Sequence, residues 1–277
     1  MHSLDIDSEL PIGVFDSGVG GLTVLRAVRA ALPRESTLYL GDTARVPYGT
    51  KSRESVLRYS VQASAHLVGR GIKALVVACN TASALALPEL RAHWAPLPVL
   101  GVIAPGAHAA VAASARRRHL VLATEATVAG HAYAHAIRAL DPGASIEELA
   151  CSLLVALAEE GWTDGPVATA AIAAYLGDVT ARPATERPDS VILGCTHFPL
   201  LAEPIRAVIG PECVLTDSAV ATANALAQLL ENAQLLRSSV GGELRLLATD
   251  GPARFARLGT RFLNAAVSVE DVELVDL

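Results

Sequence analysis

The sequence predicts an α/β fold in which two similar domains, each a mainly parallel sheet flanked by helices, meet at a cleft. Short runs rich in Val, Ile and Leu alternate with helix-like segments along the 277 residues. Such alternation is typical of βαβ units, whose strands run parallel and whose crossovers are right-handed. A weak internal repeat, visible in the order of strand-end residues and not in identity, divides the chain near Pro96.

Six apolar runs have the length of buried strands, and five longer segments are predicted helices. The predicted strands are residues 12–15, 37–40, 74–78, 98–102, 119–123 and 189–193. The predicted helices are residues 22–32, 52–70, 105–115, 128–140 and 166–181, and Gly71 is placed to cap the second of them. Residues 210–277 add two strands, 243–248 and 272–275, and either form a third layer or return to complete the first domain.

Several of these strands are followed by residues whose side chains can take part in catalysis or binding. In the first series the strand ends lie at Asp16, Asp42 and Cys79, and in the second series at Ala104, Thr124 and Cys195. Ligands of open parallel sheets bind beyond the carboxyl ends of the strands. We therefore expect a site in the cleft where the two sets of strand ends meet.

Composition excludes several classes of protein. Hydrophobic residues make up 52% and charged residues 18% of the chain, which argues against disorder. A net charge of −6 gives no footprint for nucleic acid, and the run Arg116-Arg117-Arg118 is expected to be a solvated turn. No uninterrupted apolar stretch is long enough for a membrane span. Residues 1–10 are acidic without an apolar centre, so we expect a loose tail and not a signal peptide.

The four cysteines lack zinc spacing and are expected to be free thiols in a reducing, cytoplasmic compartment. Two of them end matched apolar runs, in Cys79-Asn80-Thr81 and Cys195-Thr196-His197. A single cysteine there would be a small core residue, whereas a matched pair favours chemistry. If the two segments face each other, two thiols flank one pocket, which suits removal of a proton from one face of a carbon and delivery to the other.

Charged neighbours can assist these thiols. A helix N-terminus or a protonated histidine lowers the pKa of a thiol. His197 lies two residues beyond Cys195, and Asp16 is placed to assist Cys79 across the cleft. Cys151 and Cys213 have no such neighbours and are assigned to the core. We expect the two reactive sulfurs to face a common cavity, within roughly 10 Å of each other, because both must reach one stereocentre.

Each of the other polar clusters has two possible interpretations. The glycine-rich turn after Asp16 favours either a bound anion or a tight βα turn, and it lacks a complete dinucleotide fingerprint. Thr127 is either a site hydroxyl or a helix N-cap. His131 and His135 have the spacing of metal ligands or of a solvated helix face, the second being favoured without a zinc motif.

With these residues in place, the chain resembles the glutamate racemases, within the wider group of cofactor-independent aspartate/glutamate racemases. The resemblance rests on residues 15–24, 41–49, 78–83, Thr124 with Thr127, and 194–201, in order and spacing from about residue 12 to 217. Cys-Asn-Thr at 79–81 together with Gly-Cys-Thr-His-Phe-Pro-Leu at 194–200 is the most specific part.

The resemblance implies that residues 1–97 plus 210–277 form one α/β domain and residues 98–209 the other. It implies racemisation without cofactor, metal or nucleotide, in which Cys79 takes the α-proton from D-glutamate and Cys195 takes it from L-glutamate. Asp16 and His197 would tune or relay protons. The substrate's ammonium and carboxylates would be held by Asp16, Ser17, Pro47, Tyr48, Gly49, Asn80, Thr81, Thr124, Thr127 and Thr196. A homodimer and a role in supplying D-glutamate for peptidoglycan are also implied.

One segment departs from the family pattern. Near Cys151 the family reads Cys-Pro, Val-Pro and then Glu, whereas here Ser152 and Ala156 replace both prolines. Because proline fixes φ, the loss of both prolines predicts a looser segment and leaves the position of Glu159 open.

Three alternative functions remain. The first is a related racemase acting on aspartate or another amino acid, and the second is a decarboxylase, for which one thiol suffices. The third is a non-catalytic protein-binding role such as inhibition of a DNA topoisomerase.

Overall fold

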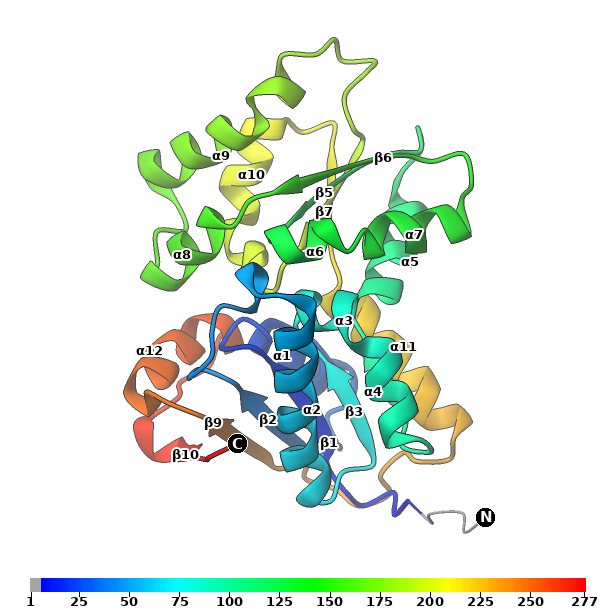
Figure 1. Ribbon diagram of the computed structural model, residues 1–277, viewed down its shortest axis with the longest axis vertical. Coiled ribbons are helices and arrows are strands. Elements are labelled where there is room, and N and C mark those ends of the chain that lie inside the picture. Colours follow the sequence, from blue (N-terminus) through cyan, green and yellow to red (C-terminus); the bar gives the residue numbers. More distant parts are fainter. Residues whose placement is uncertain (1–5) are drawn as a thin grey trace.

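The computed structural model describes residues 6–277, whose strands form two parallel sheets, one in each half of the molecule (Figure 1). The first sheet has the order β10-β9-β2-β1-β3-β4 and the second the order β6-β5-β7-β8. The strands of the first are β1 (Ile12–Asp16), β2 (Thr37–Gly41), β3 (Ala74–Val77), β4 (Val99–Gly101), β9 (Leu244–Ala248) and β10 (Val272–Leu274). Those of the second are β5 (Arg118–Ala123), β6 (Ser145–Ala150), β7 (Ser190–Gly194) and β8 (Val214–Asp217). The predicted fold class is confirmed.

Helices flank both sheets. Those beside the first sheet are α1 (Leu22–Ala31), α2 (Arg53–Gly69), α3 (Asn80–Leu85), α4 (Leu87–Trp94), α11 (Ala219–Asn232) and α12 (Pro252–Leu263). Those beside the second are α5 (Ile103–Ala113), α6 (Glu125–Ala129), α7 (Ala132–Leu140), α8 (Leu153–Glu160), α9 (Gly165–Thr180) and α10 (Ala202–Ile209). Short 3-10 turns are η1 (Tyr48–Thr50), η2 (Phe198–Leu201) and η3 (Val269–Asp271). The α5 helix packs on α7, β7 and β8 and also contacts α11, and α3 meets α6 where the two halves join (Figure 1).

Local sequence explains most of these elements. Strands β1, β2, β3 and β7 are buried along their whole length, as expected for parallel strands covered on both faces. In α1, Leu22, Leu25 and Val28 are buried at helical spacing against the core. Ser52 caps α2 by accepting a hydrogen bond from the amide of Ser55.

The strand pairing corrects the predicted division of the chain at two places. The predicted strand 98–102 corresponds to β4, which pairs with β3 in the first sheet, so Ala104 in α5 does not begin a second series. Strand β8 was not predicted and pairs with β7 in the second sheet, beyond the predicted end of that domain at residue 209. Only the two short helices α3 and α4 separate β3 from β4, and these consecutive strands lie side by side in the sheet. The division into 1–97 plus 210–277 and 98–209 otherwise remains a prediction.

The C-terminal part of the chain returns to the first sheet. Strand β9 pairs with β2 in parallel register, Thr37 opposite Leu244, and β10 pairs with β9. Of the two predicted arrangements of residues 210–277, β9 and β10 therefore follow the second, a return to the first domain, whereas β8 at 214–217 belongs to the second sheet. Within the second half, the predicted helix 128–140 is two helices, because His131 between α6 and α7 has a φ of +48°.

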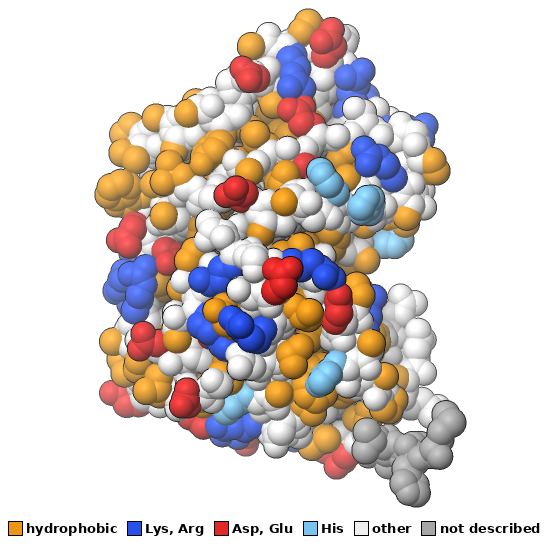
Figure 2. Space-filling view, in the orientation of Figure 1, with side chains coloured by type: hydrophobic (Ala, Val, Ile, Leu, Met, Phe, Trp, Pro, Cys, Tyr) orange, Lys and Arg blue, Asp and Glu red, His pale blue; other side chains and the backbone are white. Residues whose placement is uncertain are grey.

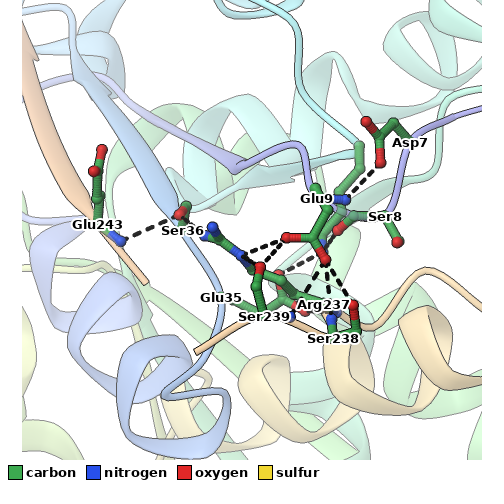
Figure 3. Close-up of polar contacts among 10 residues, drawn as sticks. Asp7, Ser8, Glu9, Glu35, Ser36, Arg237, Ser238, Ser239 and Glu243 are labelled. Carbon is green, nitrogen blue, oxygen red and sulfur yellow. Dashed lines mark hydrogen bonds and ion pairs between the residues drawn. The ribbon is translucent and has the colours of Figure 1, made fainter. Parts of the chain in front are cut away.

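The start of the described chain is held by polar contacts, which corrects the predicted loose tail for residues 8 and 9. Nζ of Lys73 donates to the carbonyl of Ser8 at 2.6 Å and pairs with Glu35 at 2.5 Å. Glu9 accepts hydrogen bonds from Arg237, Ser238 and Ser239 (Figure 3). Residues 1–5 of that prediction lie outside the described residues.

Within 6–277, none of the helices combines the length and apolar character required to cross a bilayer.

Candidate active site

Both predicted reactive cysteines lie at carboxyl ends of strands and line one cavity between the two halves. Cys79 follows β3 and caps α3, its Sγ accepting from the amide of Ala82 at 3.5 Å. Cys195 directly follows β7. The cavity is lined by Ser17, Val46, Pro47, Tyr48, Gly49, Cys79, Asn80, Thr81, Thr124, Val155, Cys195, Thr196 and His197. Of the predicted site residues, Asp16 and Thr127 lie behind this lining; Val46 and Val155 were not predicted.

The surroundings of Cys79 favour its protonated thiol form. Burial raises its pKa to about 12, the charge of Asp16 adds to this, and hydrogen bonds with Ser17 and Ala82 oppose it only in part. Sγ of Cys79 donates to Oγ of Ser17 at 3.4 Å. The expected lowering of this pKa by the helix N-terminus is therefore outweighed by desolvation.

Asp16 is completely buried beneath the site. Burial raises the pKa of its carboxyl, opposed by the charge of His197 and by the amides of Gly18 and Gly21. Oδ2 accepts from the amide of Gly18 at 2.9 Å, which closes the turn after β1. A Cβ added to Gly20 would lie 2.6 Å from Nδ1 of His197, so the glycines allow a close approach of this turn to the opposite half. Of the two interpretations of the turn, the structure supports the tight βα turn.

His197 lies between Cys195 and Glu159. Its Nδ1 is 3.7 Å from Sγ of Cys195, and its Nε2 is 3.1 Å from Oε1 of Glu159. Burial lowers the pKa of His197, but the contacts with Cys195 and Glu159 outweigh this and raise it to about 10. At neutral pH His197 is thus an imidazolium that donates to both neighbours.

Glu159 comes from α8, the segment that lost both family prolines, and it still reaches the site. Burial raises its pKa, but His197 and Arg254 outweigh burial and bring the pKa below its ordinary value. Nη2 of Arg254 lies 3.0 Å from Oε2 of Glu159. Arg254 was missed by sequence reasoning because it belongs to no motif and lies 95 positions from Glu159.

Three threonine hydroxyls join the two halves at the cavity. Oγ1 of Thr81, in α3, is 2.9 Å from Oγ1 of Thr124 and 3.1 Å from Oγ1 of Thr127, which are themselves 2.9 Å apart. Thr124, and not Thr127, is the N-cap residue of α6, so the N-cap interpretation of Thr127 is wrong. Such a triangle can redirect its hydroxyl hydrogens between donor and acceptor roles.

The loop with Pro47 and Gly49 forms one wall of the site. The hydroxyl of Tyr48 donates to Oδ2 of Asp42 at 2.5 Å, and Asp42 also pairs with Arg45 at 2.7 Å. The polar tip of Tyr48 is therefore engaged within its own loop. A Cβ on Gly49 would lie 2.6 Å from Cβ of Thr124, so this loop touches the opposite half of the molecule.

The remaining clusters are structural. Cys151 and Cys213 are buried free thiols, as predicted, and all four cysteines are unpaired. His131 contacts Glu148 at 2.7 Å on the surface, and among residues 6–277 no group of side chains has the make-up of a metal site. Arg116 and Arg117 bind the carbonyl of Ala184 and the carboxylate of Asp141, so the basic run anchors neighbouring loops.

Comparison with known proteins places this geometry in context. Residues 18–226 match the family described as Asp/Glu/hydantoin racemase. The chain is 49% identical to the glutamate racemase of Geobacter metallireducens over 267 residues, 96% of each chain. Its structure is similar to that of a glutamate racemase from Bacillus anthracis, with a TM-score of 0.91, 35% identity and 98% of both chains covered. A glutamate racemase of Francisella tularensis, solved in complex with D-glutamate, has a TM-score of 0.89 at 33% identity, covering 97% of this chain and 98% of that one.

Proposed function

Because this chain belongs to the Asp/Glu/hydantoin racemase family, we propose that it interconverts L-glutamate and D-glutamate without a cofactor. The observation that carries the proposal is the presence of two thiols, Cys79 and Cys195, in the lining of one cavity. Relatives named glutamate racemase that match almost the whole chain support glutamate as the substrate. Aspartate is the alternative substrate to be tested.

In the proposed reaction the two thiols act as alternating base and acid. A thiolate at Cys195 removes the α-proton of L-glutamate, and the thiol of Cys79 protonates the opposite face to give D-glutamate. The reverse direction begins with the Cys79 thiolate. The carbanion intermediate needs preorganised donors in a site that excludes water, because an α-proton next to a carboxylate is very weakly acidic.

Proton supply is assigned to the charged neighbours of each thiol. His197, beside Cys195, exchanges protons with that sulfur, and Glu159 holds the imidazolium in place. Asp16 has a raised pKa behind Cys79, which suits a group that takes up and returns a proton. The different surroundings of the two thiols would let one start as base while the other starts as acid.

The substrate's charged groups are assigned to the polar lining. Asn80 and the amides at the start of α3 provide donors for a carboxylate, and the hydroxyls of Thr81, Thr124 and Thr196 complete the set. Ser17 lies beside Cys79 and is assigned to the ammonium group. The backbone of Pro47, Tyr48 and Gly49 closes the opposite wall.

The test uses purified protein with L-glutamate in heavy water and no added cofactor. We expect D-glutamate to form, with deuterium at its α-carbon. A protein that produces neither D-glutamate nor α-deuterated glutamate would refute the proposal. Parallel incubations with L-aspartate and other amino acids distinguish a related racemase from a glutamate enzyme.

We extend the proposal to the cellular setting: a cytoplasmic homodimer that supplies D-glutamate for peptidoglycan synthesis. Figure 2 shows hydrophobic side chains gathered over α8 and α9, where Leu153, Trp162 and Val167 are exposed. Apolar patches of this kind are common at protein contacts. Sedimentation equilibrium tests the dimer, and rescue of a D-glutamate auxotroph tests the cellular role.

A further inference from the structure

We propose that Tyr133 is a positioning residue that fixes the orientation of the Asn80 side-chain amide, so that its NH2 group faces the cavity and receives a carboxylate oxygen of the substrate. The inference rests on the proposed function for the identity of the substrate. Tyr133 belongs to no motif of the sequence analysis and comes from α7, in the opposite half of the molecule from Asn80.

The contact between the two side chains is short and buried. The hydroxyl of Tyr133 donates to Oδ1 of Asn80 at 2.7 Å, and Tyr133 is completely inaccessible to solvent. Burial raises the pKa of Tyr133 above its ordinary value, so the phenol keeps the proton that it donates. An amide accepts only through its oxygen, and this bond therefore selects one of the two amide orientations.

The selected orientation leaves a donor free at the site. Nδ2 of Asn80 is buried and has no hydrogen-bond partner in the described part of the chain. Asn80 lines the cavity beside Cys79. A buried amide N–H without a partner is unfavourable, and a carboxylate oxygen would satisfy it. The flipped amide would instead present Oδ1 to the carboxylate, which repels it, and the phenol would have to turn its hydrogen away to accept from the NH2 group.

Tyr133 is itself held by close packing against backbone. A Cβ on Gly106 in α5 would lie 3.2 Å from the Tyr133 ring, and a Cβ on Gly194 would lie 3.1 Å from it. Gly194 is the last residue of β7 and directly precedes Cys195. The ring therefore lies against the strand that carries one thiol while its hydroxyl binds the residue that follows the other.

The decisive variant is Tyr133→Phe, which keeps the ring and removes the hydroxyl. We expect KM for both glutamate enantiomers to rise about 10-fold with kcat changed less than about 3-fold, because a substrate contact loses its orientation. Tyr175→Phe is the matched control, since its hydroxyl accepts from the amide of Leu153 at 3.3 Å outside the cavity lining. Its KM should equal that of the wild type.

A double-mutant comparison separates positioning from general damage. In an Asn80→Ala background, Tyr133→Phe should leave KM unchanged, because the group that it orients is missing. An unchanged KM in the single variant, or effects of the two substitutions that multiply, would overturn the inference.

A readout without turnover distinguishes failure of the inference from failure of the proposed function. In the ligand-free protein, the side-chain carbonyl 13C resonance of Asn80, assigned from its loss in Asn80→Ala, should shift in Tyr133→Phe and not in Tyr175→Phe. A shift in a protein that racemises no glutamate would refute the proposed function and leave the positioning role standing. An unshifted resonance would refute the positioning role whatever the activity.

Discussion

Oε1 of Glu159 lies 3.1 Å from Nε2 of His197, on the side of the imidazole ring opposite Cys195. Arg254 contacts the other oxygen of Glu159 at 3.0 Å. The chain from Arg254 through Glu159 and His197 thus connects a half-exposed guanidinium to a buried sulfur. It keeps His197 charged in a site where burial alone would make it neutral.

Replacing Glu159 should change both stability and its dependence on pH. The pKa of His197 is raised from 6.5 to about 10, so its contribution to stability is complete below pH 6.5 and is lost as the pH rises towards 10. The pKa of Glu159 is lowered, so its contribution is lost as the pH falls below about its ordinary value of 4.5. Glu159→Gln should therefore cost about 1–3 kcal/mol near pH 6 and progressively less towards pH 10. Urea unfolding between pH 4 and pH 10 measures this, and a cost that does not vary with pH would contradict it.

The two thiols should be separately required for racemisation. Cys79→Ser and Cys195→Ser are each expected to lower kcat by about 10²–10⁴-fold, because a positioned acid or base is lost. In heavy water Cys79→Ser should exchange the α-proton only of L-glutamate, and Cys195→Ser only that of D-glutamate. Cys151→Ser is the control, since that thiol lies in the core outside the cavity lining. Equal exchange of both enantiomers by either single variant would contradict the two-base scheme.

The threonine triangle should matter for substrate binding more than for stability. Thr81→Val removes the hydroxyl that bridges Thr124 and Thr127, and we expect KM to rise about 5- to 30-fold, the cost of one or two hydrogen bonds. Thr222→Val is the matched control, because that buried hydroxyl has no partner within residues 6–277 and does not line the cavity. Steady-state kinetics test the pair, and equal KM values for the two variants would contradict the role of the triangle.

Gly20 should tolerate no side chain. In Gly20→Ala the new methyl group would meet Thr196 and the ring of His197, so we expect both to shift and kcat/KM to fall about 100-fold. Gly69→Ala, at the end of α2, is the control because a Cβ there would meet, among the described residues, no atom beyond its own stretch of helix within 4 Å. That substitution should stabilise the protein by about 0.5–1 kcal/mol. A Gly20→Ala enzyme with wild-type kinetics would show that the close approach is unimportant.

The buried ion pair between Lys73 and Glu35 should affect stability without affecting catalysis. Both side chains are nearly inaccessible and lie at the amino ends of strands, away from the cavity. Lys73→Met leaves the Glu35 charge unpaired and should cost about 3–5 kcal/mol, with KM unchanged. The exposed pair of Arg53 and Glu89 is the control, and Arg53→Met should cost less than about 1 kcal/mol. Similar unfolding midpoints for the two variants would contradict this ranking.

The sequence was sufficient to predict the strands that carry the main site residues, because that prediction depends only on neighbouring residues. Apolar runs bounded by polar residues predicted the strands that end at Asp16, Cys79, Thr124 and Cys195, and each of these residues lies at the carboxyl end of a strand. Parallel strands then bring their ends to one edge of a sheet, which is why the predicted site residues gather at the cavity.

Local sequence patterns did not predict which segments far apart in the sequence contact each other. Strand β4 joins the first sheet and β8 the second because of the partners beside which they pack, and their own sequences resemble those of any short buried strand. Contacts of Glu159 with Arg254, and of Tyr133 with Asn80, join residues 95 and 53 positions apart, so no spacing along the chain indicates them.

The sequence by itself determined the α/β class, the strand-end positions of the two cysteines and the resemblance to a racemase family. Tertiary structure alone decided the charge states around them. Cys79 is held as a thiol and His197 as an imidazolium because burial removes water while specific neighbours supply or withhold opposite charge. The dielectric surroundings of a side chain depend on atoms brought together only by folding.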